Sequence, residues 1–157
     1  MAERIARSEL ILGGQRSGKS RRAEALAGQW LEADTTHRAV LIATGQALDE
    51  EMRERIARHQ RERARRVPGL RTVEEPRALA DAVHAHAAAN TLVVIDCLTL
   101  WLTNLLMPAD GAPRDSVEPV AGLRRAIERA AGPVVLVSNE IGLGVIPLGR
   151  ETRAFVD

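Results

Sequence analysis

The chain has 157 residues, about the length of one domain, and its 45% content of hydrophobic residues is enough for a packed core. Because aromatic residues make up only 2%, we expect that core to be aliphatic. A formal net charge of +1 gives no reason to expect a nucleic-acid partner, and the single cysteine, Cys97, excludes an internal disulfide framework. The sequence shows neither a signal-peptide pattern nor an apolar run of the roughly 18 residues needed to span a membrane, so we expect a cytoplasmic protein.

Segments typical of strands and helices alternate along the chain. Strands are expected at 8–14, 38–44, 70–75, 91–96 and 133–140. Helices are expected at 19–33, 48–66, 76–89 (with Pro76 in the first turn), 98–107 and 116–132, followed by a glycine-rich loop at 141–149 and a last helix from 150. This alternation predicts an α/β fold with an open, mostly parallel sheet and helices on both faces. No repeat, linker or domain boundary is visible, so we expect a single domain over 1–157.

The first expected strand leads into the segment GGQRSGKS, which matches the pattern G-x-x-x-x-G-K-[ST] of a phosphate-binding loop. Its glycines let backbone N–H groups turn toward phosphate oxygens, and the helix that follows points its positive end at the anion. We call residues 13–20 the phosphate loop. Its candidate nucleotide-binding residues are Gly13, Gly14, Gln15, Arg16, Ser17, Gly18, Lys19 and Ser20. The alternative is a glycine-rich turn without a ligand.

Two residues of the phosphate loop have specific expected roles. Lys19 would reach the β- and γ-phosphates, and the Ser20 hydroxyl would bind Mg²⁺. Lys19 is the only lysine in a chain with 21 arginines. Every other lysine or arginine position of the chain is therefore an arginine. The exception indicates that position 19 needs a compact ammonium group.

Asp96 ends the apolar run LVVID, an expected buried strand. In an α/β sheet of this class, a carboxylate at that place faces the loop that holds the phosphates. We therefore expect Asp96 to hold Mg²⁺ directly or through water. A second interpretation is that Asp96 caps the helix that begins near Leu98, and the two roles are compatible.

His59 differs from the other three histidines, which we expect on the surface. It shares one stripe of its expected helix with Met52 and Ile56, so it should lie where that helix meets a cleft. Residues 53–66 hold seven Arg and two Glu, and such an environment favours a neutral imidazole and attracts a triphosphate. A neutral imidazole can attack phosphorus. The residues alone leave open whether His59 is this nucleophile or a histidine at the border of the core.

Five segments together resemble one known family: GGQRSGKS, LIATGQALDEEMRERIARHQ, RTVEEP, VIDCLTLWLTNLL and VLVSNEIGLGVIP. They resemble the bifunctional adenosylcobinamide kinase / adenosylcobinamide-phosphate guanylyltransferase of cobalamin biosynthesis, from about Leu10 to Asp157. Many NTPases share the phosphate loop, whereas the DEEMRERIxxH and SNEIGLGVIP blocks are far more specific. The resemblance implies a P-loop NTPase with a RecA-like sheet, in one nucleotide-binding domain that lacks the family's C-terminal helix and strand.

The resemblance also implies a pair of reactions. ATP or GTP phosphorylates adenosylcobinamide, and GMP is then transferred from GTP to the product through a GMP–histidine intermediate, which gives adenosylcobinamide-GDP. The family's histidine falls on His59, and its other nucleotide contacts fall on Ala43, Thr44, Gln60, Arg61, Glu62, Arg63, Glu74 and Asp96. The implied cofactor is Mg²⁺, held by Ser20 and Asp96, and the implied assembly is a homo-oligomer, specifically a trimer.

Three other functions remain open from the sequence. A protein similar to this family could perform only the guanylyl transfer. A P-loop small-molecule kinase with a single activity would use the same phosphate loop without modifying His59. A non-catalytic nucleotide-binding module would use the arginine-rich helix to bind nucleic acid, although the near-zero net charge argues against that partner.

Overall fold

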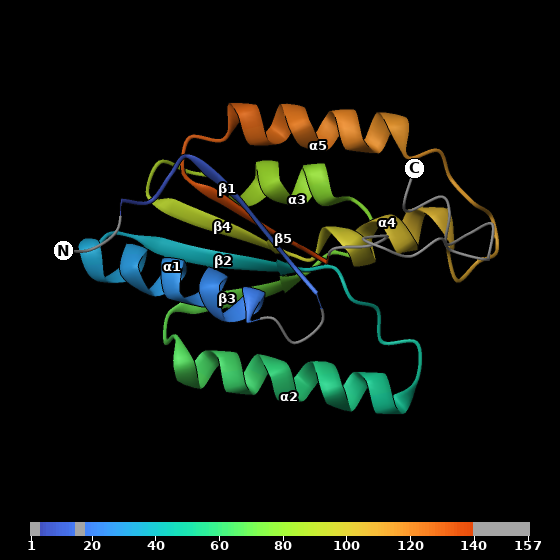
Figure 1. The fold of residues 1–157 in the computed structure, drawn as a ribbon, viewed down its shortest axis with the longest axis horizontal. Coiled ribbons are helices and arrows are strands. Elements are labelled where there is room, and N and C mark those ends of the chain that lie inside the picture. The colour runs from blue at the N-terminus through green and yellow to red at the C-terminus, as the bar shows by residue number, and fades with distance from the viewer. Residues whose placement is uncertain (1–3, 15–17, 140–157) are drawn as a thin grey trace.

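A computed structural model describes residues 4–14 and 18–139 (Figure 1). Its strands are β1 (Ser8–Gly13), β2 (Arg38–Ala43), β3 (Leu70–Glu74), β4 (Thr91–Asp96) and β5 (Val134–Asn139). Its helices are α1 (Lys19–Ala33), α2 (Glu50–Arg66), α3 (Leu79–His86), α4 (Leu98–Leu106) and α5 (Val117–Arg129). The strands and helices predicted up to residue 139 are thus confirmed, whereas the predicted loop at 141–149 and the last helix lie outside the described residues.

The five strands form one sheet in the order β1-β5-β4-β2-β3, and every neighbouring pair is parallel. Strand β5 lies between β1, which leads into the phosphate loop, and β4, which ends at Asp96. Since parallel strands end at the same edge of a sheet, the phosphate loop and Asp96 share one edge. The predicted α/β class of P-loop NTPases is confirmed.

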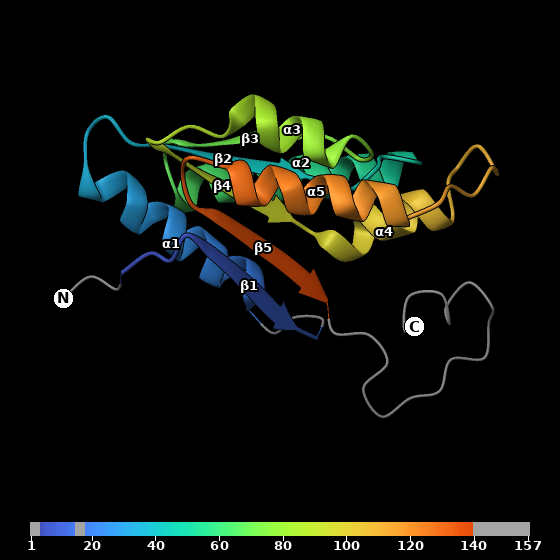
Figure 2. The same ribbon diagram turned by 90° about the horizontal axis from the view of Figure 1, so that it is seen from above.

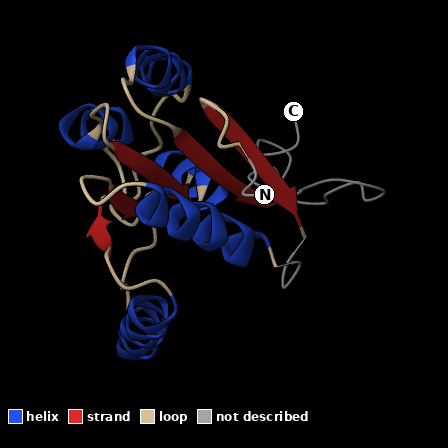
Figure 3. Ribbon diagram, turned by 90° about the vertical axis from the view of Figure 1, so that its left-hand side faces the viewer, coloured by secondary structure: helices blue, strands red, loops and turns tan. Residues whose placement is uncertain are grey.

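Helices cover both faces of the sheet, as Figures 2 and 3 show. Helix α1 covers one face, where Leu26 packs in a buried cluster with Leu41 and Val94. Helices α3, α4 and α5 cover the other face, where Trp101 joins Ile42 in a second cluster. Successive residues of β2 alternate between the two clusters, as the pleat of a strand requires. The core is aliphatic as expected, apart from Trp101.

Helix α3 begins three residues later than predicted, so Pro76 precedes the helix and does not stand in its first turn. The Glu75 carboxylate accepts hydrogen bonds from the backbone N–H groups of Arg77 and Ala78, both at 3.1 Å. These bonds hold the segment after Pro76 in a turn, which competes with the helix for the same backbone groups. The helix also ends earlier than predicted, because Ala87 has an extended backbone.

Helix α2 stands apart from the other helices, beside β3 at the edge of the sheet (Figure 1). Its start is well capped, because the Asp49 side chain accepts a hydrogen bond of 2.7 Å from the Met52 N–H. Glutamates in its first turn and arginines in its last turn complement the helix dipole. No residue of α2 is buried, so local signals rather than core packing define this helix.

Replacement of Gly132 by alanine is expected to destabilise the protein by about 1–3 kcal/mol. A Cβ atom there would overlap the carbonyl oxygens of Ala88 and Thr91. Gly28, inside α1, is the matched control because a Cβ there would have no neighbour within 4 Å. Gly28→Ala should stabilise by up to about 1 kcal/mol, since alanine favours a helix. Urea denaturation of both variants checks the opposite signs, and an equal effect at the two sites would contradict the packing.

Candidate active site

The carboxyl ends of three strands bring together residues that are far apart in the sequence. In the sheet register, Ala43 at the end of β2 is the partner of Glu74 on β3 and of Asp96 on β4. The phosphate loop and the start of α1 lie at the same edge, because β1 is parallel to the other strands. This is the edge at which open α/β sheets bind their ligands.

The described part of the phosphate loop has the expected conformation. Gly18 precedes α1 with a φ of 81°, in the left-handed region that favours glycine. The Lys19 ammonium donates a hydrogen bond of 3.0 Å to the carbonyl oxygen of Gly14 and so lies over the loop. The predicted contacts Gln15, Arg16 and Ser17 lie outside the described residues. The arrangement leaves the positive end of α1 directed at the loop, as anion binding requires.

Ser20 and Asp96 meet across the sheet edge, where the Ser20 hydroxyl donates a hydrogen bond of 3.1 Å to the Asp96 carboxylate. Burial raises the pKa of Asp96, and this effect outweighs the hydrogen bond from Ser20 and the charges of Arg63 and Lys19, which lower it. The interpretation of Asp96 as a helix cap is wrong. Cys97 is the N-cap of α4, and its sulfur accepts from the Leu100 N–H at 3.5 Å.

Hydroxyl and carboxylate oxygens are the hard ligands that Mg²⁺ prefers, so Ser20 and Asp96 fit that ion. Within the described ranges, no group of three or more His, Cys, Asp or Glu residues is arranged to hold a metal ion. Mg²⁺ commonly uses one or two protein ligands together with nucleotide phosphates and water, which suits this pair.

Replacing Asp96 with asparagine should stabilise the nucleotide-free protein at neutral pH and remove catalysis. Because the folded-state pKa of Asp96 is raised, its contribution to stability is lost as the pH rises from the ordinary value near 3.8 through the folded value. Asparagine keeps an acceptor for Ser20 without the buried charge. We expect a Tm increase of about 2–4 °C at about pH 7 and a smaller one at about pH 4. Thermal melts at both values check this, and a lower Tm for the variant at neutral pH would contradict it.

A cavity of about 440 Å³ opens beside this pair, between α1, α2 and the ends of the strands. Eight predicted site residues line it: Ser20, Ala43, His59, Gln60, Glu62, Arg63, Glu74 and Asp96. The structure therefore joins the histidine of α2 to the proposed metal ligands in one concave site. This is the arrangement expected of a pocket for a nucleotide.

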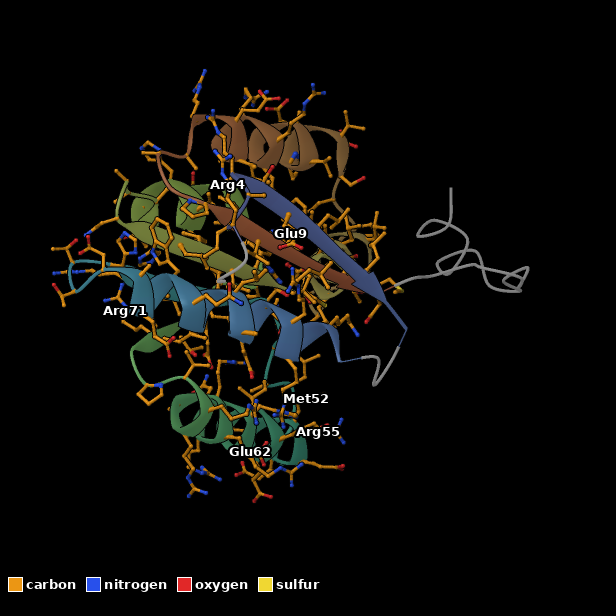
Figure 4. All side chains as sticks on the ribbon, turned by 60° about the vertical axis from the view of Figure 1, so that its left-hand side comes forward. Arg4, Glu9, Met52, Arg55, Glu62 and Arg71 are labelled. Atoms are coloured by element: carbon orange, nitrogen blue, oxygen red, sulfur yellow. The ribbon has the colours of Figure 1, made fainter. Side chains whose placement is uncertain are left out.

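Helix α2 presents one face to the cavity, as the spacing predicted. Ile56 and His59 line the cavity, and the Gln60 amide donates a hydrogen bond of 2.9 Å to the Glu74 carboxylate. Met52, on the same stripe, is 37% exposed and does not line the cavity. Figure 4 labels Met52 and Glu62 on α2 and shows side chains of this helix both toward α1 and away from the body.

Two predicted nucleotide contacts lie elsewhere. Thr44 is fully buried. Its hydroxyl donates a hydrogen bond of 2.7 Å to the Cys97 carbonyl oxygen and accepts one of 2.9 Å from the Cys97 N–H. Arg61 is exposed and does not line the cavity. Gly13, Gly14, Gly18 and Lys19 belong to the phosphate loop beside the cavity rather than to its lining. The roles of all these residues stay predictions.

Three charged residues that line the cavity were missed from the sequence: Arg21, Glu24 and Arg66. Glu24 is 4% exposed, and Arg66 binds it through two hydrogen bonds of 2.7 and 2.8 Å. The Glu24 carboxylate raises the pKa of Arg66 through these bonds. A signal was present, because Glu24 lies four residues after Ser20 and so shares its face of α1.

The phosphate loop joins β1 to α1, and an acidic residue ends a parallel strand beside Ser20. These features define a P-loop NTPase fold, with a cavity at the ends of its strands. The family described as cobinamide kinase / cobinamide phosphate guanyltransferase matches residues 9–157. The chain belongs to this family, and it is therefore a kinase and guanyltransferase of cobalamin biosynthesis.

Three curated relatives agree with this assignment. The bifunctional adenosylcobalamin biosynthesis protein CobP of Pseudomonas aeruginosa is 48% identical over 149 residues, which cover 95% of this chain and 80% of the relative. The bifunctional adenosylcobalamin biosynthesis proteins CobU of Escherichia coli and Salmonella typhimurium are 38% and 36% identical, and each match covers 94% of this chain and 83% of the relative. No helix in the described part of the chain has the length and hydropathy to cross a bilayer.

Proposed function

We propose that the enzyme phosphorylates adenosylcobinamide with ATP or GTP and then transfers GMP from GTP to the product through His59. The observation that carries this proposal is that His59, Ser20 and Asp96 line one cavity. A nucleotide whose phosphates lie on the phosphate loop would then have its α-phosphorus within the same site as the imidazole.

In the phosphoryl transfer, the aminopropanol hydroxyl of the corrinoid attacks the γ-phosphorus and the nucleoside diphosphate leaves. The Lys19 ammonium, now hydrogen-bonded to the Gly14 carbonyl, would turn to the β- and γ-phosphates and neutralise their charge. Mg²⁺, held by Ser20 and Asp96, would supply further charge neutralisation at the phosphates. His59 has no part in this step.

In the guanylyl transfer, a nitrogen of the His59 imidazole attacks the α-phosphorus of GTP and pyrophosphate leaves. The ring loses its remaining proton from the other nitrogen to solvent, which leaves a phosphoramidate with an uncharged ring and one ionised phosphate oxygen. A phosphate oxygen of the phosphorylated corrinoid then attacks the same phosphorus. The free ring nitrogen takes a proton back from solvent, so the P–N bond breaks and neutral imidazole leaves. A phosphoramidate suits this role because histidine is both a nucleophile and a good leaving group. Arg63, which lines the cavity, would balance the phosphate charge.

The remaining nucleotide contacts are proposed for Ala43, Thr44, Gln60, Arg61, Glu62 and Glu74. Glu74 already holds Gln60, so the pair presents one amide and one carboxylate to a base or ribose. We also propose a homotrimer that binds the corrinoid near its subunit contacts. Light scattering coupled to size-exclusion chromatography measures the number of subunits directly.

Mass spectrometry of the corrinoid products tests the proposed reactions. Purified protein is incubated with adenosylcobinamide, Mg²⁺ and GTP, with ATP and GTP compared as phosphoryl donors. Formation of adenosylcobinamide phosphate followed by adenosylcobinamide-GDP supports the proposal. Formation of adenosylcobinamide phosphate without adenosylcobinamide-GDP would identify a kinase with a single activity. Neither product, together with strongly salt-dependent binding of DNA or RNA, would identify a nucleic-acid-binding module.

A further inference from the structure

Helix α2 carries His59 but has little apolar attachment to the body of the protein. None of its residues is buried, and the chain enters the core only after the helix ends, at Val67. From Val67 the helix runs back along the cavity, where Ile56 is half-buried. The direction of the helix, and hence the position of His59, must therefore depend largely on polar contacts.

Two of the arginines on α2 reach Glu24, while Gln60 separately ties the helix to Glu74 on β3 through a hydrogen bond of 2.9 Å. The Glu24 carboxylate receives the Nε–H and one terminal N–H of Arg66 in a bidentate pair, at 2.8 and 2.7 Å. Arg63 adds a second cation, with its Nε 3.9 Å from the carboxylate, and donates a hydrogen bond of 3.0 Å to the Thr72 hydroxyl on β3. The side chains of Glu24 and Arg63 are only 5% and 11% exposed. Bidentate arginine–carboxylate pairs fix orientation as well as distance, so this cluster sets the angle between α1 and α2.

The cluster of Glu24, Arg63 and Arg66 lies on the same helix faces as the proposed site residues Ser20 and His59. On α1, Ser20 and Glu24 are four residues apart and share one face. On α2, His59, Arg63 and Arg66 are spaced by four and three residues and also share one face. Glu24 is thus one helical turn from the Ser20 hydroxyl and is tied directly to the face of α2 that carries His59.

We infer that Glu24 is a positioning residue for guanylyl transfer, which holds Arg66 and Arg63 and thereby fixes His59 relative to the phosphate loop. This inference rests on the proposed role of His59. Glu24 does not touch the reacting atoms. Phosphoryl transfer needs the phosphate loop but not the placement of α2, so loss of Glu24 should affect the two reactions unequally.

Glu24→Gln tests this asymmetry, since glutamine keeps the shape and removes the charge. At saturating GTP, we expect the single-turnover rate of His59 guanylylation to fall by about 30–100-fold, because small displacements of reacting groups cost about that much. Phosphoryl transfer should change by less than about threefold, because it does not depend on a displacement of His59. The matched control is Glu9→Gln, which removes the ion pair of α1 with β1 (Arg22 to Glu9, 3.3 Å) and should leave both rates unchanged.

A reversed pair separates positioning from general loss of structure. Glu24→Arg alone should lose guanylylation. The double variant Glu24→Arg with Arg66→Glu restores the ion pair, so its guanylylation rate should be at least about tenfold higher than that of Glu24→Arg. Equal losses in both reactions, no loss in Glu24→Gln, or a double variant no better than the single one would each overturn the inference.

Hydrogen exchange tests the anchor without depending on the chemistry. In Glu24→Gln, amides of α2 (Glu50–Arg66) should exchange at least about tenfold faster while those of β4 and β5 keep their protection. Unchanged exchange in α2 would overturn the positioning role. If the wild-type protein formed no GMP adduct, the proposed function would fail while this measurement still decided whether Glu24 anchors the helix.

Discussion

Replacing His59 with alanine should abolish guanylyl transfer and preserve phosphoryl transfer. The imidazole is the only group proposed to form a bond to the α-phosphorus, so its removal should lower the guanylyl-transfer rate by about 10³-fold or more. The kinase step uses the phosphate loop, Ser20 and Asp96, which the substitution leaves in place. His59 is exposed on α2, so the fold should not change. The two rates are measured separately, with adenosylcobinamide for the first step and its phosphate for the second.

His84→Ala is the matched control for this experiment. His84 is exposed on α3 and does not line the cavity, so its loss should leave both rates within about twofold of the wild type. Adenosylcobinamide-GDP formed by His59→Ala at a wild-type rate would remove the histidine intermediate. Equal loss of both reactions would instead mean that His59 serves nucleotide binding in general.

Replacing Lys19 with alanine should impair both reactions. Each proposed step develops charge on the triphosphate, and Lys19 is the cation that the phosphate loop supplies. Loss of one such preorganised donor typically costs about 10²–10³-fold in rate, so we expect kcat/KM to fall by that factor for phosphoryl transfer and by at least tenfold for guanylyl transfer. Initial rates with MgATP and MgGTP measure both values.

Lys19→Arg sharpens this test. A guanidinium fork is wider than an ammonium, and Lys19 must fit over the Gly14 carbonyl at 3.0 Å, so arginine should not restore the rate. Arg129→Ala, at an exposed position in the last turn of α5, is the matched control for loss of a cation and should change neither reaction. Full activity of Lys19→Arg would show that only the charge matters at this position.

Much of the fold was predictable because its local signals agree. Apolar runs such as the one that ends at Asp96 belong to strands buried on both faces, and the phosphate loop joins its strand to its helix as the motif requires. The start of α3 was not predictable from Pro76, because the Glu75 carboxylate captures the backbone N–H groups of the next turn. Side-chain bonds of that kind depend on the rotamer that the folded chain selects.

Site residues were predictable where they belong to one helix face or one sequence motif. They were not predictable where the contact depends on how two elements pack together. Helical spacing placed His59 beside a cleft, whereas its role as a nucleophile came from the family resemblance. Glu24 reads as one more charge on an amphipathic helix, and only the packing of α1 against α2 brings Arg66 to it. The Thr44 hydroxyl likewise forms its hydrogen bonds with the backbone of Cys97, a partner 53 residues away.

GMP should become covalently bound to His59, and incubation with α-³²P-GTP and Mg²⁺ without a corrinoid tests this expectation most directly. Wild type, His59→Ala and Lys19→Ala are then compared on a denaturing gel. We predict an acid-labile, alkali-stable label on the wild type, none on His59→Ala and a much weaker one on Lys19→Ala. Label retained by His59→Ala would place the nucleophile elsewhere, and no label on the folded wild type would contradict the covalent mechanism.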